Sequence, residues 1–147
     1  MPRDSMKIHS LKIEDYEEIV KLWSLAGLPF RPKVRDSKDA IAAQISANPD
    51  FFLGAFEDNH LVGTVITSCD GRKGWINRLA VHPDYRRLGI AEALISESEK
   101  VLKKHRIKIF CASIEDHNAA SKNLFKKCGY TEHTDIVYFS KRDSDDV

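Results

Sequence analysis

The sequence has few residues that would hold a fold together through disulfide or metal chemistry. Its 147 residues include only three cysteines, which lie far apart, and none belongs to a CxxC pair. An odd number of widely spaced cysteines leaves at least one unpaired, unlike a small disulfide-rich protein, and no Cys/His spacing suggests zinc. We therefore expect reduced thiols, no metal, and a core stabilised by apolar packing.

Long apolar runs and an excess of one charge are also missing. No segment approaches membrane-spanning length, and the N-terminal stretch MPRDSMKIHS lacks the apolar centre of a secretion signal. Twenty-three basic residues stand against 22 acidic ones, a formal net charge of +1. Such a balance gives no support for a nucleic-acid partner held by bulk electrostatics. We expect a cytoplasmic protein with neither a membrane nor a nucleic-acid partner.

What the sequence does contain is the pattern of one mixed α/β domain. A hydrophobic content of 42% with 31% charged residues is ordinary for a globular chain. No linker or repeat divides residues 1–147, so we expect a single domain with short polar tails at both ends. Periodicity and turn residues predict strands at 6–11, 51–57, 60–69, 75–81, 107–114 and 135–141, and helices at 14–27, 36–49, 90–104 and 118–129.

The stretch 80–104 joins an apolar strand to an amphipathic helix through a turn that contains Arg86, Arg87 and Gly89. The first turn of a helix presents backbone N–H groups and the positive end of the helix dipole. A glycine there lets an anion approach the backbone, and the small Ala91 adds little obstruction. The pattern favours a phosphate site, although a structural turn with solvated arginines is the alternative. Neither a P-loop nor a GxGxxG motif is present.

The element order and two spaced motifs together resemble the GCN5-related N-acetyltransferase (GNAT) family. The family motif [QR]xxGx[GA] is matched at Arg86, Gly89 and Ala91. A second family block, N-x-x-A-x-x-L-[YF]-x-K-x-G-[FY], is matched further along the chain at Asn118, Leu124, Phe125, Lys127, Gly129 and Tyr130. The resemblance implies an α/β (α+β) fold: a mixed, mostly antiparallel sheet of six to seven strands, splayed in the middle, with about four helices. It is weakest in the first two helices, which carry acceptor specificity in the family.

The resemblance also implies a ligand and a reaction. The co-substrate would be acetyl-CoA, and the activity would be direct transfer of its acetyl group to a primary amine. The pyrophosphate would lie on the amides of residues 87–91, and the pantetheine arm would pair with the backbone of residues 79–81. The implied cofactor-binding residues are Leu79, Ala80, Val81, Arg86, Arg87, Leu88, Gly89, Ile90, Ala91, Asn118 and Phe125.

The usual proton-transfer residues of the family are missing. The family's general-acid tyrosine is Phe125 here, and Ser113 stands where some members have a glutamate base. Glu115, His117 and Tyr138 are weak replacements whose ordinary roles would be helix capping or surface exposure. A covalent acetyl intermediate on a cysteine at 128 would lack the base that it needs.

Two questions stay open at this level. The residues between the first two helices could form an acceptor wall or pack onto the sheet; they are Trp23, Leu28, Pro29, Phe30 and Arg31. The missing acid and base keep a second interpretation open, a non-catalytic acetyl-CoA-binding sensor or interaction module. The sequence does not distinguish a monomer from a homodimer, nor does it identify the acceptor.

Overall fold

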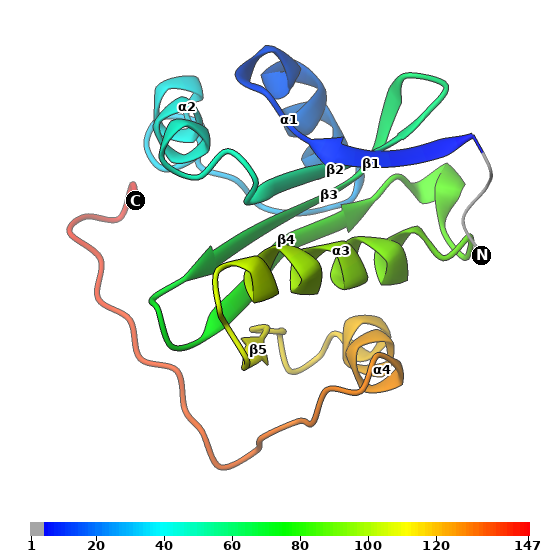
Figure 1. Ribbon diagram of the computed structural model, residues 1–147. Helices are drawn as coiled ribbons and strands as arrows, with labels where there is room; N and C mark the ends of the chain where they lie inside the picture. Colours follow the sequence, from blue (N-terminus) through cyan, green and yellow to red (C-terminus); the bar gives the residue numbers. More distant parts are fainter. Residues whose placement is uncertain (1–4) are drawn as a thin grey trace.

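The protein is built on one five-stranded sheet in the order β1-β2-β3-β4-β5 (Figure 1). The computed structural model describes residues 5–147, so most of the predicted N-terminal tail lies outside the described residues. Neighbouring strands are antiparallel except β4 and β5, which are parallel. The strands are β1 (Met6–Ser10), β2 (Phe52–Glu57), β3 (His60–Cys69), β4 (Gly74–Val81) and β5 (Phe110–Cys111).

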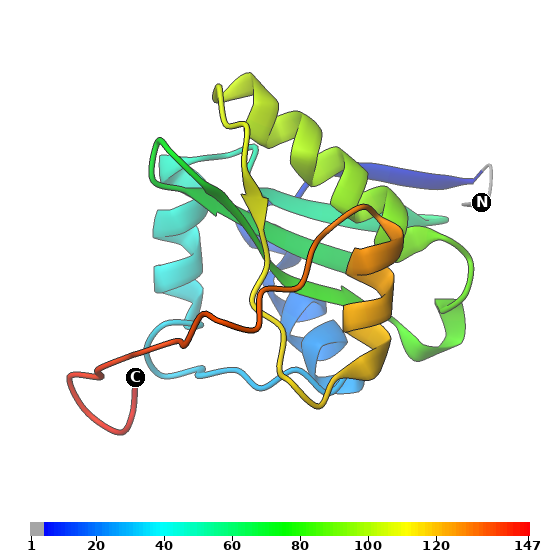
Figure 2. The same ribbon diagram turned by 90° about the horizontal axis from the view of Figure 1, so that it is seen from below.

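Helices cover both faces of this sheet. Helices α1 and α2 lie on one face, and α3 lies on the other with α4 beside it (Figures 1 and 2). The bounds are α1 (Tyr16–Leu25), α2 (Lys38–Ala47), α3 (Ile90–Lys104) and α4 (Ala119–Lys127), with short 3-10 turns η1 (Ile13–Asp15) and η2 (Pro83–Tyr85). The predicted mixed α/β fold with four α-helices is confirmed for the described residues.

Local sequence signals explain where these elements begin and end. The Ser37 hydroxyl accepts a hydrogen bond from the Ala40 amide and so caps α2. Gly27 follows α1 with φ +78°, a left-handed conformation that glycine adopts without strain. Between β2 and β3, Asp58 and Asn59 have φ +49° and +67°. Two consecutive positive φ values are typical of tight hairpin turns, which confirms the predicted hairpin.

The core fills the space between the sheet and its helices. Helix α1 contributes Ile19, Leu22 and Trp23, and the opposite helix α3 contributes Leu94 and Leu102. Gly74 at the start of β4 lies so close to α3 that an added Cβ would stand 2.6 Å from a Leu102 methyl. This close packing fixes the position of β4 under α3, and the cavity described below lies at the other end of that strand.

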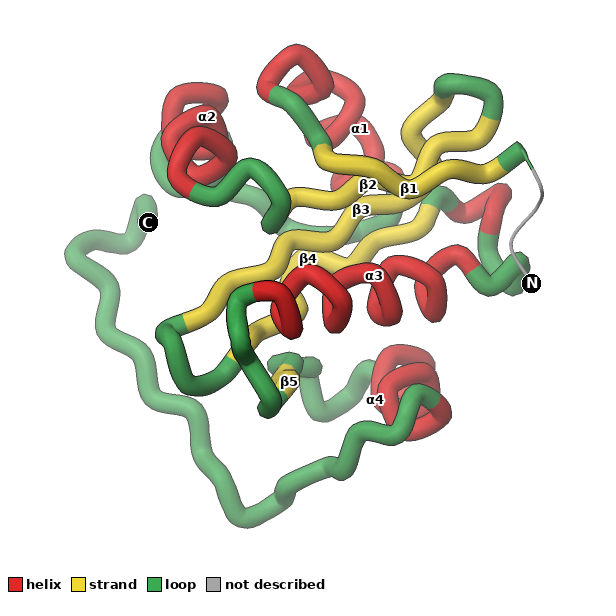
Figure 3. The backbone as a smooth tube through the Cα atoms, viewed as in Figure 1, coloured by secondary structure: helices red, strands yellow, loops and turns green. Residues whose placement is uncertain are grey.

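The C-terminal third contains fewer strands than expected. The predicted strand 107–114 is reduced to β5, which pairs only with Gly74 and Trp75 of β4. The predicted strand 135–141 is wrong: the segment is a loop (Figure 3), and Ile136–Phe139 are 71–87% exposed. A strand forms where a neighbour supplies backbone partners, and a two-residue edge strand supplies almost none. The described sheet therefore has five strands, not six to seven.

Candidate active site

The sheet splits along the second half of β4. This strand continues to Val81, but β5 accompanies it only as far as Trp75. On its other edge β4 carries a bulge, because Arg78 and Leu79 together stand opposite the single residue Val65 of β3. The predicted splay is thus confirmed. It leaves the backbone of β4 near Leu79 and Val81 without a neighbouring strand on the β5 side.

The turn after β4 presents the start of α3. Gly89 is the N-cap residue of α3, with φ +80° and ψ +9°, and Arg87 also has a positive φ of +64°. The first bond of the helix runs from the Ala93 amide to the Gly89 carbonyl, 3.0 Å. The amides of residues 90–92 precede that bond and have no acceptor within the helix. Their dipoles and the two arginines make this turn electropositive.

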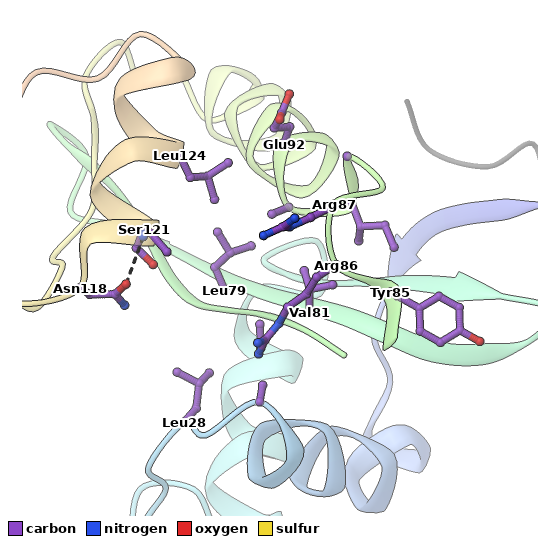
Figure 4. A pocket seen from close by; sticks show the side chains of 16 residues that line it. Leu28, Leu79, Val81, Tyr85, Arg86, Arg87, Glu92, Asn118, Ser121 and Leu124 are labelled. Carbon is purple, nitrogen blue, oxygen red and sulfur yellow. Dashed lines mark hydrogen bonds between the residues drawn. The ribbon is translucent and has the colours of Figure 1, made fainter. Parts of the chain in front are cut away.

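A cavity of about 460 Å³ lies between the split strand, this turn and α4 (Figure 4). Such a volume is in the range of small-molecule and cofactor sites. Arg86 and Arg87 extend from the turn, and Asn118 and Ser121 face them from the first turn of α4. Nine of the predicted cofactor-binding residues line the cavity: Leu79, Ala80, Val81, Arg86, Arg87, Gly89, Ile90, Ala91 and Asn118.

Two predicted residues do not line this cavity. Leu88 lies outside its wall. The Phe125 ring is 6% exposed and packs edge-to-face on Tyr130, with the ring centroids 5.1 Å apart, so it belongs to the core. The lining residues that were not predicted as cofactor-binding are Ala26, Leu28, Tyr85, Glu92, Ala120, Ser121 and Leu124. Helical spacing within the second motif block could have pointed to Ser121 and Leu124, one and two turns after Asn118.

Asn118 has a structural role as well as a position in the wall. Its side-chain oxygen accepts a hydrogen bond from the Ser121 amide, 3.1 Å, and so caps α4 (Figure 4). Residues from the first turn of this helix and from the first turn of α3 line the same cavity. Two helix N-termini at one cavity favour an anionic ligand there.

The candidate acid and base residues lie elsewhere. Glu115 and His117 are exposed and Tyr138 is 84% exposed, and none of the three lines the cavity. The single carboxylate in the described wall is Glu92, whose Oε1 lies 2.9 Å from the Lys127 Nζ. That hydrogen bond lowers the pKa of Glu92, which makes it a weaker base. No lining carboxylate is thus set up to remove a proton.

The last turn of α1 and the residues that follow it contribute to both the core and the cavity. Leu28 lines the cavity, whereas the Trp23 ring is 1% exposed. The Trp23 Nε1 donates to the Thr64 Oγ1, 3.0 Å, and that hydroxyl donates to the Arg78 carbonyl, 3.2 Å. Of the five residues considered for an acceptor wall, Leu28 lines the cavity and Trp23 packs in the core, while Pro29, Phe30 and Arg31 do not line the cavity.

Thiol and metal chemistry have no support at this site. Burial raises the pKa of the Cys111 and Cys128 thiols, and neither residue lines the cavity. Within residues 5–147 no group of three or more His, Cys, Asp or Glu side chains is arranged to hold a metal ion. In the same described range, no helix is both long and apolar enough to cross a membrane.

Comparison with known proteins identifies the class to which this fold and cavity belong. A family model described as the acetyltransferase (GNAT) family matches residues 16–130. The acetyltransferase SG1711 of Sodalis glossinidius is 33% identical over 137 residues, 93% of this chain and 95% of its own length. The acetyltransferase plu1384 of Photorhabdus laumondii is 34% identical over 138 residues, with the same coverage.

A solved structure agrees with these relatives. The PaiA N-acetyltransferase from Thermoplasma acidophilum, in complex with coenzyme A, superimposes with a TM-score of 0.72 at 26% identity, covering 84% of this chain and 88% of that one. The chain belongs to the GNAT acetyltransferase family. The predictions of an acetyl-CoA-dependent acetyltransferase and of acetyl-CoA as co-substrate are thereby confirmed.

Proposed function

We propose that this enzyme transfers the acetyl group of acetyl-CoA directly to a primary amine. The observation that carries the proposal is the cavity that joins the open edge of β4 to the N-terminus of α3. Backbone amides at residues 90–92, with Arg86 and Arg87 beside them, suit the pyrophosphate of the co-substrate. The unpaired edge of β4 suits the amide-containing arm, which can pair with it as an added strand would.

The reacting thioester would then lie near Leu79 and Ala80, where β4 has separated from β5. Acetyl-CoA supplies an activated acyl group. The protein contributes a fixed position for it and backbone N–H donors near the carbonyl oxygen on which charge develops. Leu28 and Ala26 form the opposite wall, so the amine would approach between α1 and the split strand.

The residues that line the cavity limit how the acceptor amine can lose its proton. Glu92 is held by Lys127, and no other carboxylate lines the described cavity. The enzyme would therefore accept an amine that is already neutral, or one that loses its proton to water. In that case kcat/KM rises with pH until the acceptor's own ammonium group is deprotonated and then levels off.

The test is release of free CoA from acetyl-CoA over a panel of primary amines, with the N-acetyl product identified by mass spectrometry. The matched controls are the N,N-dimethyl forms of the same amines, which should give no product. For accepted amines of different pKa, the midpoint of the pH profile should move with the amine. Tight acetyl-CoA binding without turnover on any amine would overturn the proposal in favour of a sensor, and a fixed midpoint would reveal an enzyme base.

A further inference from the structure

A half-buried cation with two inaccessible, unpaired donor atoms lies next to the cavity. The Nε and Nη2 atoms of Arg78 are inaccessible to solvent and have no hydrogen-bond partner among the described residues. The guanidinium carbon lies 4.2 Å from the centre of the Trp23 ring. Burial lowers the pKa of Arg78, because the charged form has lost its water. Unsatisfied buried donors on a charged group are costly, so their retention calls for an explanation.

The β4 bulge places this side chain. Arg78 has φ +53°, an uncommon value for a residue other than glycine, and its carbonyl is held by the Thr64 hydroxyl at 3.2 Å. The same hydroxyl accepts the Trp23 indole N–H. The bulge thus directs Arg78 over the Trp23 ring while the next residue, Leu79, lines the cavity. Strained backbone that fixes a polar group is typical of functional positions.

The end of α1 and the residues after it connect the Trp23 ring, on which Arg78 packs, to the proposed acceptor wall. The Leu28 amide donates to the Trp23 carbonyl, 2.9 Å, and Leu28 itself lines the cavity. Residues 23–28 therefore place the Trp23 ring in the core and Leu28 in the cavity wall. Arg78 lies over the Trp23 ring, and its neighbour on β4, Leu79, lies where we propose that the thioester binds.

The charges around Arg78 do not provide it with a hydrogen-bonded partner. Asp36 is the acid that acts on it electrostatically, and Arg35 opposes that effect. The Asp36 carboxylate is used by its own loop: it accepts the Arg31 amide at 2.6 Å and lies 4.0 Å from the Arg35 Nε. Hence the edge of Arg78 formed by Nε and Nη2 stays unpaired.

We propose that Arg78 binds a carboxylate on the acceptor, so that the acceptor is an amine that also carries an acid group, as amino acids and peptide C-termini do. The inference rests on the proposed amine transfer. Nε and Nη2 form the side of the guanidinium that matches a carboxylate with two parallel hydrogen bonds. Because both atoms are inaccessible to solvent, binding requires the side chains around them to move. The same cation disfavours polycationic acceptors.

The experiment compares acceptors that differ only in the acid. Amino acids and dipeptides are each assayed beside their C-terminal amides, with free CoA as the readout. The native enzyme should prefer the acid over the amide by about tenfold or more in kcat/KM. Arg78→Gln should remove that preference by raising KM for the acid about tenfold more than KM for the amide. Arg78→Lys keeps the charge but cannot form two parallel hydrogen bonds to a carboxylate. Its preference for the acid should therefore lie between those of the native enzyme and Arg78→Gln.

The control is Arg72→Gln, an exposed arginine in the turn between β3 and β4, which should leave every value unchanged. Unfolding midpoints show whether each variant is folded. Equal loss on acid and amide in Arg78→Gln, or no preference in the native enzyme, would make Arg78 a structural residue and overturn the inference.

Calorimetry of the same amino acids with the CoA-bound protein separates the two proposals. Carboxylate-dependent binding that Arg78→Gln abolishes, without turnover, would support Arg78 and refute amine transfer. Turnover of amides and acids alike would support amine transfer and refute the role of Arg78.

Discussion

The two proposed substrate sides of the site are built in different ways. On the proposed co-substrate side, one continuous stretch, residues 79–92, provides the open strand, the turn and the helix N-terminus. On the proposed acceptor side, Trp23, Thr64 and Arg78 lie next to the cavity and not in its wall; they come from three separate elements and meet through hydrogen bonds and a ring contact. A site made of backbone groups from one stretch of chain can be encoded by a short sequence motif. A site made of side chains from distant positions depends on how the elements pack.

The largest effect should come from filling the backbone site. Gly89→Glu adds a side chain at φ +80° and a negative charge where a pyrophosphate would bind, so acetyl-CoA affinity should fall by about a hundredfold or more. Gly71→Glu is the matched control, since Gly71 has φ +86° and open space around it in the turn before β4. Both variants carry similar backbone strain. Calorimetry that finds equal affinities in the two variants would remove the pyrophosphate assignment.

The acceptor side can be weakened through its hydrogen bonds. Thr64→Val leaves the buried Trp23 indole N–H without its acceptor and should cost about 1–3 kcal/mol in the free energy of unfolding. It should also raise the acceptor KM, because Trp23 supports Arg78.

Thr67→Val is the comparison for this variant. Its hydroxyl donates to the Phe51 carbonyl, which also accepts the Thr67 amide and so stays satisfied. This variant should cost about 1 kcal/mol and leave the acceptor KM unchanged. Urea titrations and acceptor kinetics measure both quantities. An equal rise in KM in the two variants would show a general effect of stability.

Helix caps test whether α4 belongs to the co-substrate side. Asn118→Ala and Ser37→Ala each remove a side-chain cap and should cost about 1 kcal/mol in unfolding free energy. Only the first should also weaken acetyl-CoA binding, by a fewfold, because Asn118 lines the cavity and Ser37 does not. Unchanged binding in Asn118→Ala would exclude the first turn of α4 from the co-substrate site.

The smallest effect is expected at the thiols. Cys128→Ala should keep full acetyl transfer, since burial raises the pKa of that thiol and it lies outside the cavity wall. Mass spectrometry after a single turnover should find no acetyl group on the protein. A stable acetyl adduct that disappears in the variant would contradict direct transfer.

The sequence predicted the elements whose signals are local. Gly27, Ser37 and the Asp58-Asn59 pair have side chains or φ values that end a helix, cap one or turn a hairpin, whatever surrounds them. The motif around Gly89 likewise predicted residues that the structure places in the wall of the cavity. Phe125 packs inward onto Tyr130 and does not line the cavity, and the predicted strand at residues 135–141 was wrong because its β-rich composition needs a neighbouring strand. A local sequence pattern shows neither whether a side chain packs inward nor whether a segment has a neighbouring strand with which to pair.

By itself, then, the sequence determined the order of the four helices and the first four strands, the electropositive turn at the start of α3 and the family to which the chain belongs. Only the tertiary structure decided that β5 leaves β4 after Trp75, that Arg78 and Leu79 form a bulge opposite Val65, and that an unpaired guanidinium is held over Trp23. The physical reason is how far apart in the sequence the interacting residues lie. A backbone turn depends on neighbouring residues, whereas a bulge and a half-buried cation depend on partners brought together by the fold.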